Sequence, residues 1–278
     1  MPESPEVEAL ARFLAEEASG REVRGVDVLE FRTIKTRAAP PASITGRTIT
    51  GARRHGKHVE LVLDEASLVV SLGRHGWMRW LDAAPDEAVS LSADAPPALA
   101  SFELSGDRSL QVTDAGSWVS LGLFVVGDAG EVPAIAKLGP DPADSAFTRD
   151  QFDGALGGRR KQIKAILQEQ ESLAGIGNAY SDEILHLAKV SPVTHAAALD
   201  DGSADRLFDA TLTTVRGAID ARRGVPIDQL KAHKVAAMRV HGRTGEACPV
   251  CGDIIRDLTF AGTSAQYCPT CQNGGVPL

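Results

Sequence analysis

Four cysteines stand in two C-x-x-C pairs, the spacing of a metal-binding turn. The pairs are Cys248 with Cys251 and Cys268 with Cys271, and sixteen residues separate them. The thiolates of one pair converge on a turn, and two such turns complete a tetrahedral site. Four soft thiolates suit zinc, and a site with four protein ligands is closed, so we expect one structural Zn2+. Two redox dithiols or two disulfides are the alternative interpretations.

The chain begins with Met1, Pro2 and Glu3, a second group of residues suited to chemistry. Methionine aminopeptidases remove an initial methionine when a small residue follows, which would leave Pro2 with a free secondary amine. Such an amine attacks an aldehyde carbon and forms an iminium ion without a side-chain base. Glu3 beside it could move protons to a sugar oxygen. A proline at the second position has no such role in most proteins, so this interpretation depends on the remaining motifs.

A glycine-rich connection lies between two predicted helices in the second half of the chain. It runs over 171–178 and contains Gly175, Gly177 and Asn178. Glycines at alternate positions permit tight turns, and a connection that ends at a helix N-terminus exposes backbone N–H groups that bind anions. The pattern indicates an anion-binding turn, although most Gly-x-Gly turns are only turns.

Charge is distributed unevenly along the chain. The net charge is −8 and the sequence pI is about 5.4, which in bulk argues against a nucleic-acid partner because phosphate contacts need Lys and Arg. Residues 82–153 hold 13 acidic and three basic side chains, whereas the rest of the chain holds 26 basic and 24 acidic ones. Basic clusters lie at 53–57, 159–164 and 221–245. Each by itself is explained by a solvated face, but the three together are consistent with a nucleic-acid partner.

The hydrophobic pattern predicts the elements that position these residues. A chain of 278 residues is long enough for two domains and a small third module. Ser4 and Pro5 start an N-terminal helix. Short alternating runs from 23 to 126, the last over 118–126, predict a β-rich sandwich or flattened barrel. After a linker at 137–142, helices are predicted over 147–156, 161–170, 179–190 and 205–223.

The sequence lacks the signals of a membrane or secreted protein. Apolar runs such as 67–72 and 121–126 fall far short of the ~20 residues that span a bilayer. The N-terminus carries glutamates where a secretory signal has basic residues. The cysteines are confined to one cluster, where a secreted scaffold would spread them. We therefore expect a cytoplasmic protein.

Five motifs together resemble those of the formamidopyrimidine-DNA glycosylase/endonuclease VIII family of base-excision repair. They occur in order across essentially the whole chain, at 1–8, 53–57, 138–142, 174–178 and 240–246, the last leading into the four cysteines. The resemblance implies an α+β fold, in agreement with the pattern above. Its parts would be an N-terminal helix with a β-sandwich over 1–136, a helix–two-turns–helix DNA-binding domain over 137–240 and a C-terminal zinc-ribbon finger over 241–278.

The resemblance also implies the mechanism of a bifunctional DNA glycosylase/AP lyase. A damaged nucleotide, expected to be oxidised, would be flipped from the duplex at a cost of roughly a few kcal/mol. Pro2 would attack C1′ of the sugar, expel the base and leave a Schiff base, while Glu3 donates a proton to the opened sugar. Lys57 would hold phosphate and assist the β-elimination that nicks the strand; without the resemblance it is one more solvent-exposed lysine. Glu6 would support this group from the first turn of the helix.

The implied partner is double-stranded DNA with a damaged base or an abasic site. A monomer would bind it, and in a bacterium would act at the nucleoid. Asn178 and the turn amides before it, including that of Gly177, would hold the DNA backbone. Further DNA contacts are expected from Lys161, Arg243, Trp118 and Arg74.

The chain departs from the family pattern at three places. Thr263 stands where many members have an arginine bonded to the lesion phosphates, which puts δ-elimination in doubt. Segments 72–77 and 113–118 lack the methionine and the Arg–Phe pair that fill the gap left by the flipped base, although Trp118 could stack there. Segment 230–240 is shorter than in 8-oxoguanine-specific members, which have a lid there. These departures favour an altered specificity, for oxidised pyrimidines or abasic sites.

A non-catalytic damaged-DNA-binding protein on the same scaffold is the alternative. The intact Pro2, Glu3 and Lys57 favour the enzyme. Retention of Met1 would favour the binding protein, because the Pro2 nitrogen would then be an amide and could not react.

Overall fold

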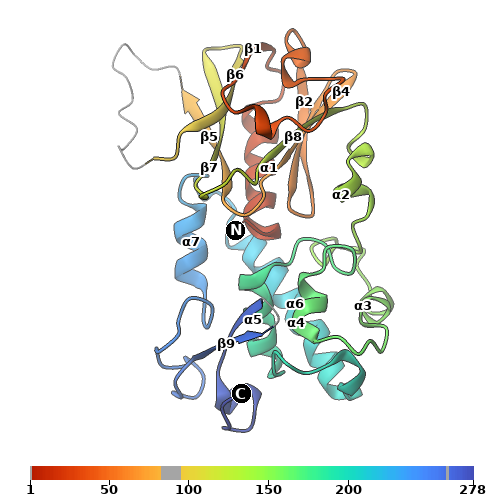
Figure 1. Ribbon diagram of the computed structural model, residues 1–278, viewed down its shortest axis with the longest axis vertical. Coiled ribbons are helices and arrows are strands. Elements are labelled where there is room, and N and C mark those ends of the chain that lie inside the picture. The colour runs from red at the N-terminus through yellow and green to blue at the C-terminus, as the bar shows by residue number, and fades with distance from the viewer. Residues whose placement is uncertain (1, 83–94, 261–262) are drawn as a thin grey trace. The chain divides into compact units, whose positions relative to one another are not determined.

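The computed structural model describes residues 2–82, 95–260 and 263–278, apart from the side chains at 260 and 263 (Figure 1). Its contacts divide the described chain into two compact units. The first contains residues 2, 7–136 and 226–228, and the second contains residues 3–6, 137–225 and 229–278. None of the helices in these ranges is long and apolar enough to cross a membrane.

The first unit contains two antiparallel four-stranded sheets and most of the N-terminal helix, as the sequence predicts. One sheet has the order β1-β6-β7-β5 and the other β2-β3-β4-β8. The strands are β1 Val23–Val28, β2 Ile49–His55, β3 His58–Leu63, β4 Ala66–Ser71, β5 Gly76–Asp82, β6 Ala98–Leu104, β7 Arg108–Asp114 and β8 Gly122–Val126. The helices are α1 Ser4–Glu17, η1 Phe31–Thr33, η2 Pro41–Ile44, η3 Ala129–Glu131 and α2 Pro133–Ala136. Helix α1 buries Val7, Leu10 and Leu14 completely.

The last predicted strand is shorter than expected. Strand β8 begins at Gly122, four residues later than the predicted start at Trp118. The preceding segment is a loop held by the carboxylate of Asp114, which accepts hydrogen bonds from the backbone N–H groups of Ser120 at 2.8 Å and Leu121 at 3.2 Å. Side-chain hydrogen bonds to the backbone compete with strand pairing here.

The second unit is helical and has a two-stranded sheet near its C-terminus (Figure 1). Its elements are α3 Arg149–Leu156, α4 Ile163–Gln168, α5 Asn178–Ala188, η4 Ala196–Ala198, α6 Asp201–Asp220, α7 Leu230–Ala237, β9 Arg256–Phe260, β10 Thr263–Tyr267 and α8 Pro269–Gln272. The predicted helices all occur, within a few residues of the expected bounds. Helix α7 was not predicted, because Leu230 is the one buried residue of this helix and an apolar stripe is therefore missing.

The core of the second unit surrounds α5. Tyr180 and Ile184 of this helix are almost fully buried and pack with Phe152 of α3 and Leu167 of α4 in one cluster. The side chains that α5 does not need for this core remain available for the polar contacts described below.

Candidate functional site

The carboxylate of Glu3 lies at the N-terminus of helix α5. It is 1 % exposed and accepts hydrogen bonds from the backbone N–H groups of Gly177, of Ala179 at 3.1 Å and of Tyr180 at 3.4 Å. The unpaired amides and the dipole of a helix N-terminus stabilise negative charge. The turn that the sequence predicts to bind an anion therefore binds one from this chain, and the Gly177 amide expected to hold DNA backbone donates to Glu3.

Gly177 is required by this close approach. A Cβ at this position would lie 2.6 Å from Cδ and 2.9 Å from Cγ of Glu3, closer than carbon atoms can stand. Its φ of −129° is extended backbone, so conformational freedom is not the reason for a glycine here. The reason is the space that the Glu3 side chain occupies.

Glu6 is a second buried carboxylate beside Glu3. It is 2 % exposed, and its Oε2 accepts the backbone N–H of Glu3 at 3.1 Å. Its Oε1 accepts the hydroxyl of Tyr180 at 2.7 Å and lies 2.8 Å from Nε of Arg222, which is equally buried. Burial and the charge of Glu6 raise the pKa of Tyr180 far above its ordinary value, so the phenol remains a donor. Glu6 thus fixes the chain on the C-terminal side of Pro2.

Lys234 of helix α7 joins the two carboxylates. Its Nζ lies 3.0 Å from Oε1 of Glu3, 3.1 Å from Oε2 of Glu6 and 4.8 Å from the ring centroid of Tyr180. The side chain is 12 % exposed. In the sequence it is one member of the basic cluster 221–245, and its separation from Glu3 by 231 positions leaves no local pattern to identify it.

Lys57 lies in the turn between β2 and β3, next to Gly56, whose φ of 55° is left-handed. A buried polar chain braces the strands that enter and leave this turn. Nε2 of His55 lies 2.7 Å from Oε2 of Glu60, and the Ser67 hydroxyl donates to Oε1 of Glu60 at 2.6 Å. These contacts fix the hairpin that carries Lys57.

The candidate nucleophile Pro2 and one ring nitrogen of His58 are shielded from solvent. Pro2 is buried. His58 follows Lys57, and its Nδ1 is buried without a hydrogen-bond partner among the described residues. Burial, reinforced by the charges of His55 and Lys57, lowers the pKa of His58 to about 4, so the ring is neutral at pH 7.

The basic cluster 159–164 differs from the expected DNA-binding surface in one member. Lys164 is fully buried, and its Nζ contacts Oδ1 of Asp182 at 2.6 Å and the Ser181 hydroxyl at 2.9 Å. Burial lowers the pKa of Lys164, against the opposing effect of Asp182. Asp182 also accepts from His241, with Nδ1 at 2.7 Å. Lys164 is therefore a structural cation and not a phosphate contact.

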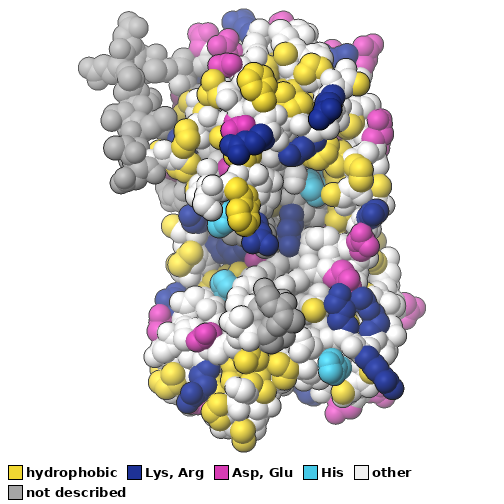
Figure 2. Space-filling model, viewed as in Figure 1, with side chains coloured by type: hydrophobic (Ala, Val, Ile, Leu, Met, Phe, Trp, Pro, Cys, Tyr) yellow, Lys and Arg dark blue, Asp and Glu magenta, His cyan; other side chains and the backbone are white. Residues whose placement is uncertain are grey.

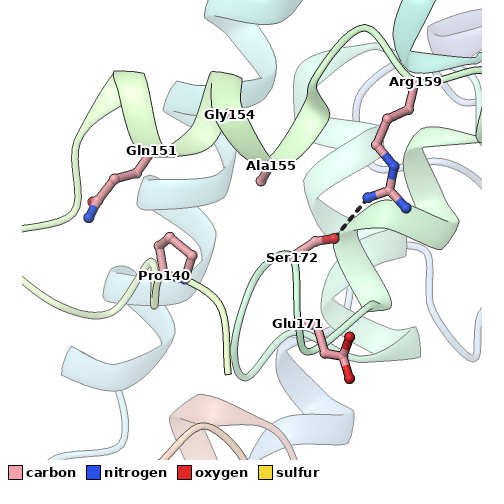
Figure 3. A pocket seen from close by; sticks show the side chains of 7 residues that line it. All are labelled: Pro140, Gln151, Gly154, Ala155, Arg159, Glu171 and Ser172. Atoms are coloured by element: carbon pink, nitrogen blue, oxygen red, sulfur yellow. Dashed lines mark hydrogen bonds between the residues drawn. The ribbon is translucent and has the colours of Figure 1, made fainter. Parts of the chain in front are cut away.

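Two half-exposed members of this cluster are paired with one glutamate. Arg159 and Lys161 lie 2.8 Å and 2.7 Å from the carboxylate of Glu169. Hydrogen bonds from Arg159, then Lys161 and Ser172, lower the pKa of Glu169 to about 2. A pocket of about 400 Å³ lies beside this group (Figure 3). It is lined by Pro140, Gln151, Gly154, Ala155, Arg159, Glu171 and Ser172.

Two other predicted DNA-binding residues of the second unit have structural partners. The Asn178 amide accepts from Gln168 at 3.0 Å and donates to the Ser264 hydroxyl at 3.3 Å. Arg243 contacts the carbonyl groups of Val235 and Met238 at the C-terminus of α7, where a cation is favourable. The side chain of Thr263, the position of the family arginine, lies outside the described atoms.

In the first unit, Trp118 projects from the loop held by Asp114 and is 62 % exposed. Burial would raise the pKa of Asp114, but the hydrogen bonds from Ser120, Gly116 and Leu121 outweigh it and lower the pKa. Arg74 is also exposed, and its backbone N–H donates to Ser120. On the face shown in Figure 2, Lys and Arg side chains form separate patches with acidic side chains between them.

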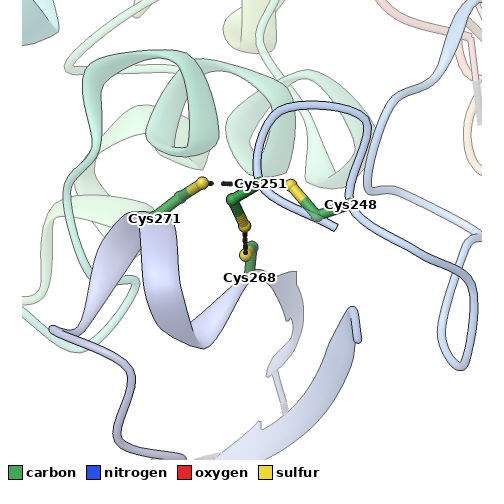
Figure 4. Close-up of side chains that lie close together, drawn as sticks. All are labelled: Cys248, Cys251, Cys268 and Cys271. Carbon is green, nitrogen blue, oxygen red and sulfur yellow. Dashed lines mark hydrogen bonds between the residues drawn. The ribbon is translucent and has the colours of Figure 1, made fainter. Parts of the chain in front are cut away.

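The four cysteines meet in the hairpin module (Figure 4). Their sulfur atoms lie within 4.8 Å of one another. Sγ of Cys251 lies 3.3 Å from Sγ of Cys268, and Sγ of Cys248 lies 3.9 Å from Sγ of Cys271; both distances are far longer than the ~2.05 Å of a disulfide, and all four cysteines are free. Burial raises the pKa of Cys268 to about 11, and a metal ion would bind this thiol in its deprotonated form. The donor set therefore fits a tetrahedral metal ion, and the disulfide alternative is wrong.

Helix α5 also contacts this module. Nε2 of its buried His186 lies 3.3 Å from Sγ of Cys248. The carboxylate of Glu183 accepts the backbone N–H groups of Val240 at 3.0 Å and His241 at 2.9 Å, where the chain enters the finger. Gln272 of α8 donates to the carbonyl of Val190 at 2.9 Å.

Models of protein domains place the chain in a class of DNA-repair proteins. The formamidopyrimidine-DNA glycosylase N-terminal domain matches residues 1–117, and the formamidopyrimidine-DNA glycosylase H2TH domain matches residues 138–227. The zinc finger found in FPG and IleRS matches residues 245–274. The expected fold and the metal-binding finger are thereby confirmed.

Relatives along the whole chain define the family. Formamidopyrimidine-DNA glycosylase of Mycolicibacterium smegmatis is 34 % identical over 288 residues, covering 98 % of this chain and 97 % of the relative. An uncharacterized formamidopyrimidine-DNA glycosylase-like protein of Mycobacterium tuberculosis is 44 % identical over 146 residues, 52 % of this chain and 91 % of that protein. The chain belongs to the formamidopyrimidine-DNA glycosylase family.

Solved structures agree. Lactococcus lactis Fpg in complex with DNA containing an oxidized pyrimidine superposes with a TM-score of 0.84 and 28 % identity, covering 98 % of this chain and 100 % of that one. The MutM (Fpg) protein of Thermus thermophilus has a TM-score of 0.80 and 30 % identity, with 99 % and 100 % covered.

Proposed function

We propose that this protein is a DNA glycosylase/AP lyase that acts through Pro2 on double-stranded DNA with an oxidised pyrimidine or an abasic site. The observation that carries the proposal is the placement of Glu3. A carboxylate adjacent in sequence to a secondary amine is fixed by three backbone amides and a lysine at a helix N-terminus. Family membership and the L. lactis complex with an oxidized pyrimidine support the substrate class.

The reaction needs an amine, a proton carrier and a phosphate ligand. The Pro2 nitrogen attacks C1′ of the flipped nucleotide, the N-glycosidic bond breaks, and the base leaves as an anion with the bonding electrons. The nitrogen loses its proton as the iminium ion forms, and Glu3 passes a proton to O4′ as the C1′–O4′ bond opens. Removal of a C2′ proton then expels the 3′ phosphate. Lys57 at the tip of the β2–β3 turn binds phosphate during this β-elimination.

Three side chains would contact DNA in this proposal. Trp118, largely exposed on its loop, is suited to stack on a base, and Arg74 and Lys161 are suited to phosphate. Zn2+ on the four cysteines would be a single structural ion that holds the finger hairpin together. In this proposal the protein is a monomer that works on DNA in the cytoplasm.

Borohydride trapping tests the proposal. The protein, with the mass of its N-terminus determined, is incubated with duplexes containing an abasic site or an oxidised pyrimidine. We expect a covalent adduct that a peptide map places on the Pro2 nitrogen, and Lys137→Met, at an exposed position outside the basic clusters, should retain it. DNA binding without an adduct on any substrate would instead establish a damaged-DNA-binding protein and refute the enzyme.

A further inference from the structure

Lys234 has a role that the family motifs do not assign. It belongs to α7, a helix in which Lys231 and His233 are exposed, yet its own ammonium lies between two almost fully buried carboxylates. The distances to Glu3 and Glu6 are 3.0 Å and 3.1 Å. A lysine side chain loses considerable freedom when it is fixed in this way, so the contact is a built feature of the site.

The charges around Glu3 show what the ammonium does. Glu3 and Glu6 are like charges joined by a hydrogen bond from the backbone of one to the carboxylate of the other. Without compensation, one of two adjacent buried carboxylates takes up a proton. Arg222 compensates Glu6 at 2.8 Å. Lys234 supplies the second positive charge, directly on Glu3.

We propose that Lys234 is a positioning residue for Glu3, which it keeps ionised and directed to the N-terminus of α5 until substrate binds. This rests on the proposed function, in which Glu3 must be a carboxylate to take up the proton that Pro2 releases. Lys234 also contacts Oε2 of Glu6, so it can stay bound there while Oε1 of Glu3 exchanges its partner. The lowest pH at which Glu3 is ionised, and therefore the lower pH limit of the reaction, then depends on Lys234.

Groups from five parts of the chain surround this carboxylate pair and affect its charge. They are Glu6 of α1, Lys164 of α4, Tyr180 of α5, Arg222 after α6 and Lys234 of α7. Lys234 is the member with 12 % of its side chain exposed, whereas Arg222 and Lys164 are 2 % and 0 % exposed. A change at Lys234 therefore perturbs the core least.

The first test needs no DNA. The amide N–H signals of Gly177 and Ala179 report the charge of the carboxylate they bind, and NMR follows them over about pH 3 to 8. In Lys234→Met we expect the midpoint of their transition to rise by about one unit or more, because an opposite charge within hydrogen-bond distance is lost. Lys234→Arg should stay near the wild type, and Lys231→Met should not differ from it.

The second test follows borohydride trapping against pH. The pH below which the trapping rate falls should be higher in Lys234→Met than in the wild type, by the same shift as the amide midpoint. One pH unit below the shifted midpoint, the rate should be about a tenth of its value at high pH. Recovery at higher pH separates this effect from a structural defect. If Lys234→Met unfolds, Lys234→Gln, which keeps a donor but not the charge, replaces it.

The outcomes separate the two ideas. Identical amide transitions in the wild type and in Lys234→Met would overturn the role of Lys234, whatever the activity. Absence of an adduct in the wild type would refute the enzyme, while the amide transitions would still report on Lys234.

Discussion

Replacing Gly177 by alanine should displace the Glu3 carboxylate with little effect on the backbone. The new Cβ would stand 2.6 Å from Cδ of Glu3, and the extended φ of −129° suits alanine. Because Glu3 is held by Ala179 and Lys234 on its other oxygen, the side chain cannot move aside without losing donors. The strain falls on the carboxylate that carries the proton in the proposed mechanism.

The size of the effect follows from these bonds. A hydrogen bond to a charged group contributes about 1.5–3 kcal/mol, so loss of the equivalent of one such bond lowers the trapping rate about 10- to 100-fold. Overpacking should also lower the free energy of unfolding by about 1–3 kcal/mol. Trapping on an abasic duplex measures the change in rate, and chemical denaturation measures the change in the free energy of unfolding.

Two comparisons make this prediction specific. Gly217→Ala lies in α6 at a position where a Cβ meets nothing within 4 Å, so it should leave both quantities at or above the wild-type value. In a Glu3→Ala background, Gly177→Ala should cost almost no stability, since the atoms it would strike are gone. Wild-type trapping by Gly177→Ala would refute the reasoning.

Two further predictions concern histidines. In the folded protein the pKa of His58 is about 4, below the ordinary 6.5, so the unfolded chain binds more protons between these pH values. The free energy of unfolding should therefore fall as the pH drops from about 6.5 to 4. His58→Leu should make the melting temperature depend less on pH in this window, and a slope equal to that of the wild type would contradict the prediction. His186→Phe removes the hydrogen bond to Cys248 and should weaken zinc retention against a chelator about 10-fold or more. His195→Leu, at an exposed position, is the control. Equal rates of zinc release from His186→Phe and the wild type would show that His186 does not help to hold the metal.

Sequence patterns predicted the elements whose signals are local. The helix start at Ser4, the strand alternation and the cysteine spacing each depend on neighbouring residues, and the structure contains all three. Helix α7 carries no such signal, because Leu230 is its one buried apolar residue and the inward-facing Lys234 reads in the sequence as a surface charge.

The site itself depends on long-range contacts that no spacing encodes. Lys164 and Lys161 belong to one basic cluster in the sequence. Lys164 is fully buried and forms an ion pair with Asp182, whereas Lys161 is half-exposed and forms an ion pair with Glu169. Lys234 appears in the sequence as surface charge and is found on Glu3. Burial, which decides what a lysine does, is a property of the packed helices.

The contacts of α5 bear on how this protein can be divided for engineering. Zinc fingers are commonly cut out and transplanted as portable modules, but here the finger is built partly on a helix outside its own sequence. The buried core of the finger comprises Val240, Cys248, Ile255 and Cys268, and Glu183, His186 and the Val190 carbonyl complete its polar contacts from the helical side. An excised fragment beginning at 241 would leave these partners behind, so a transplantable finger must bring α5 with it.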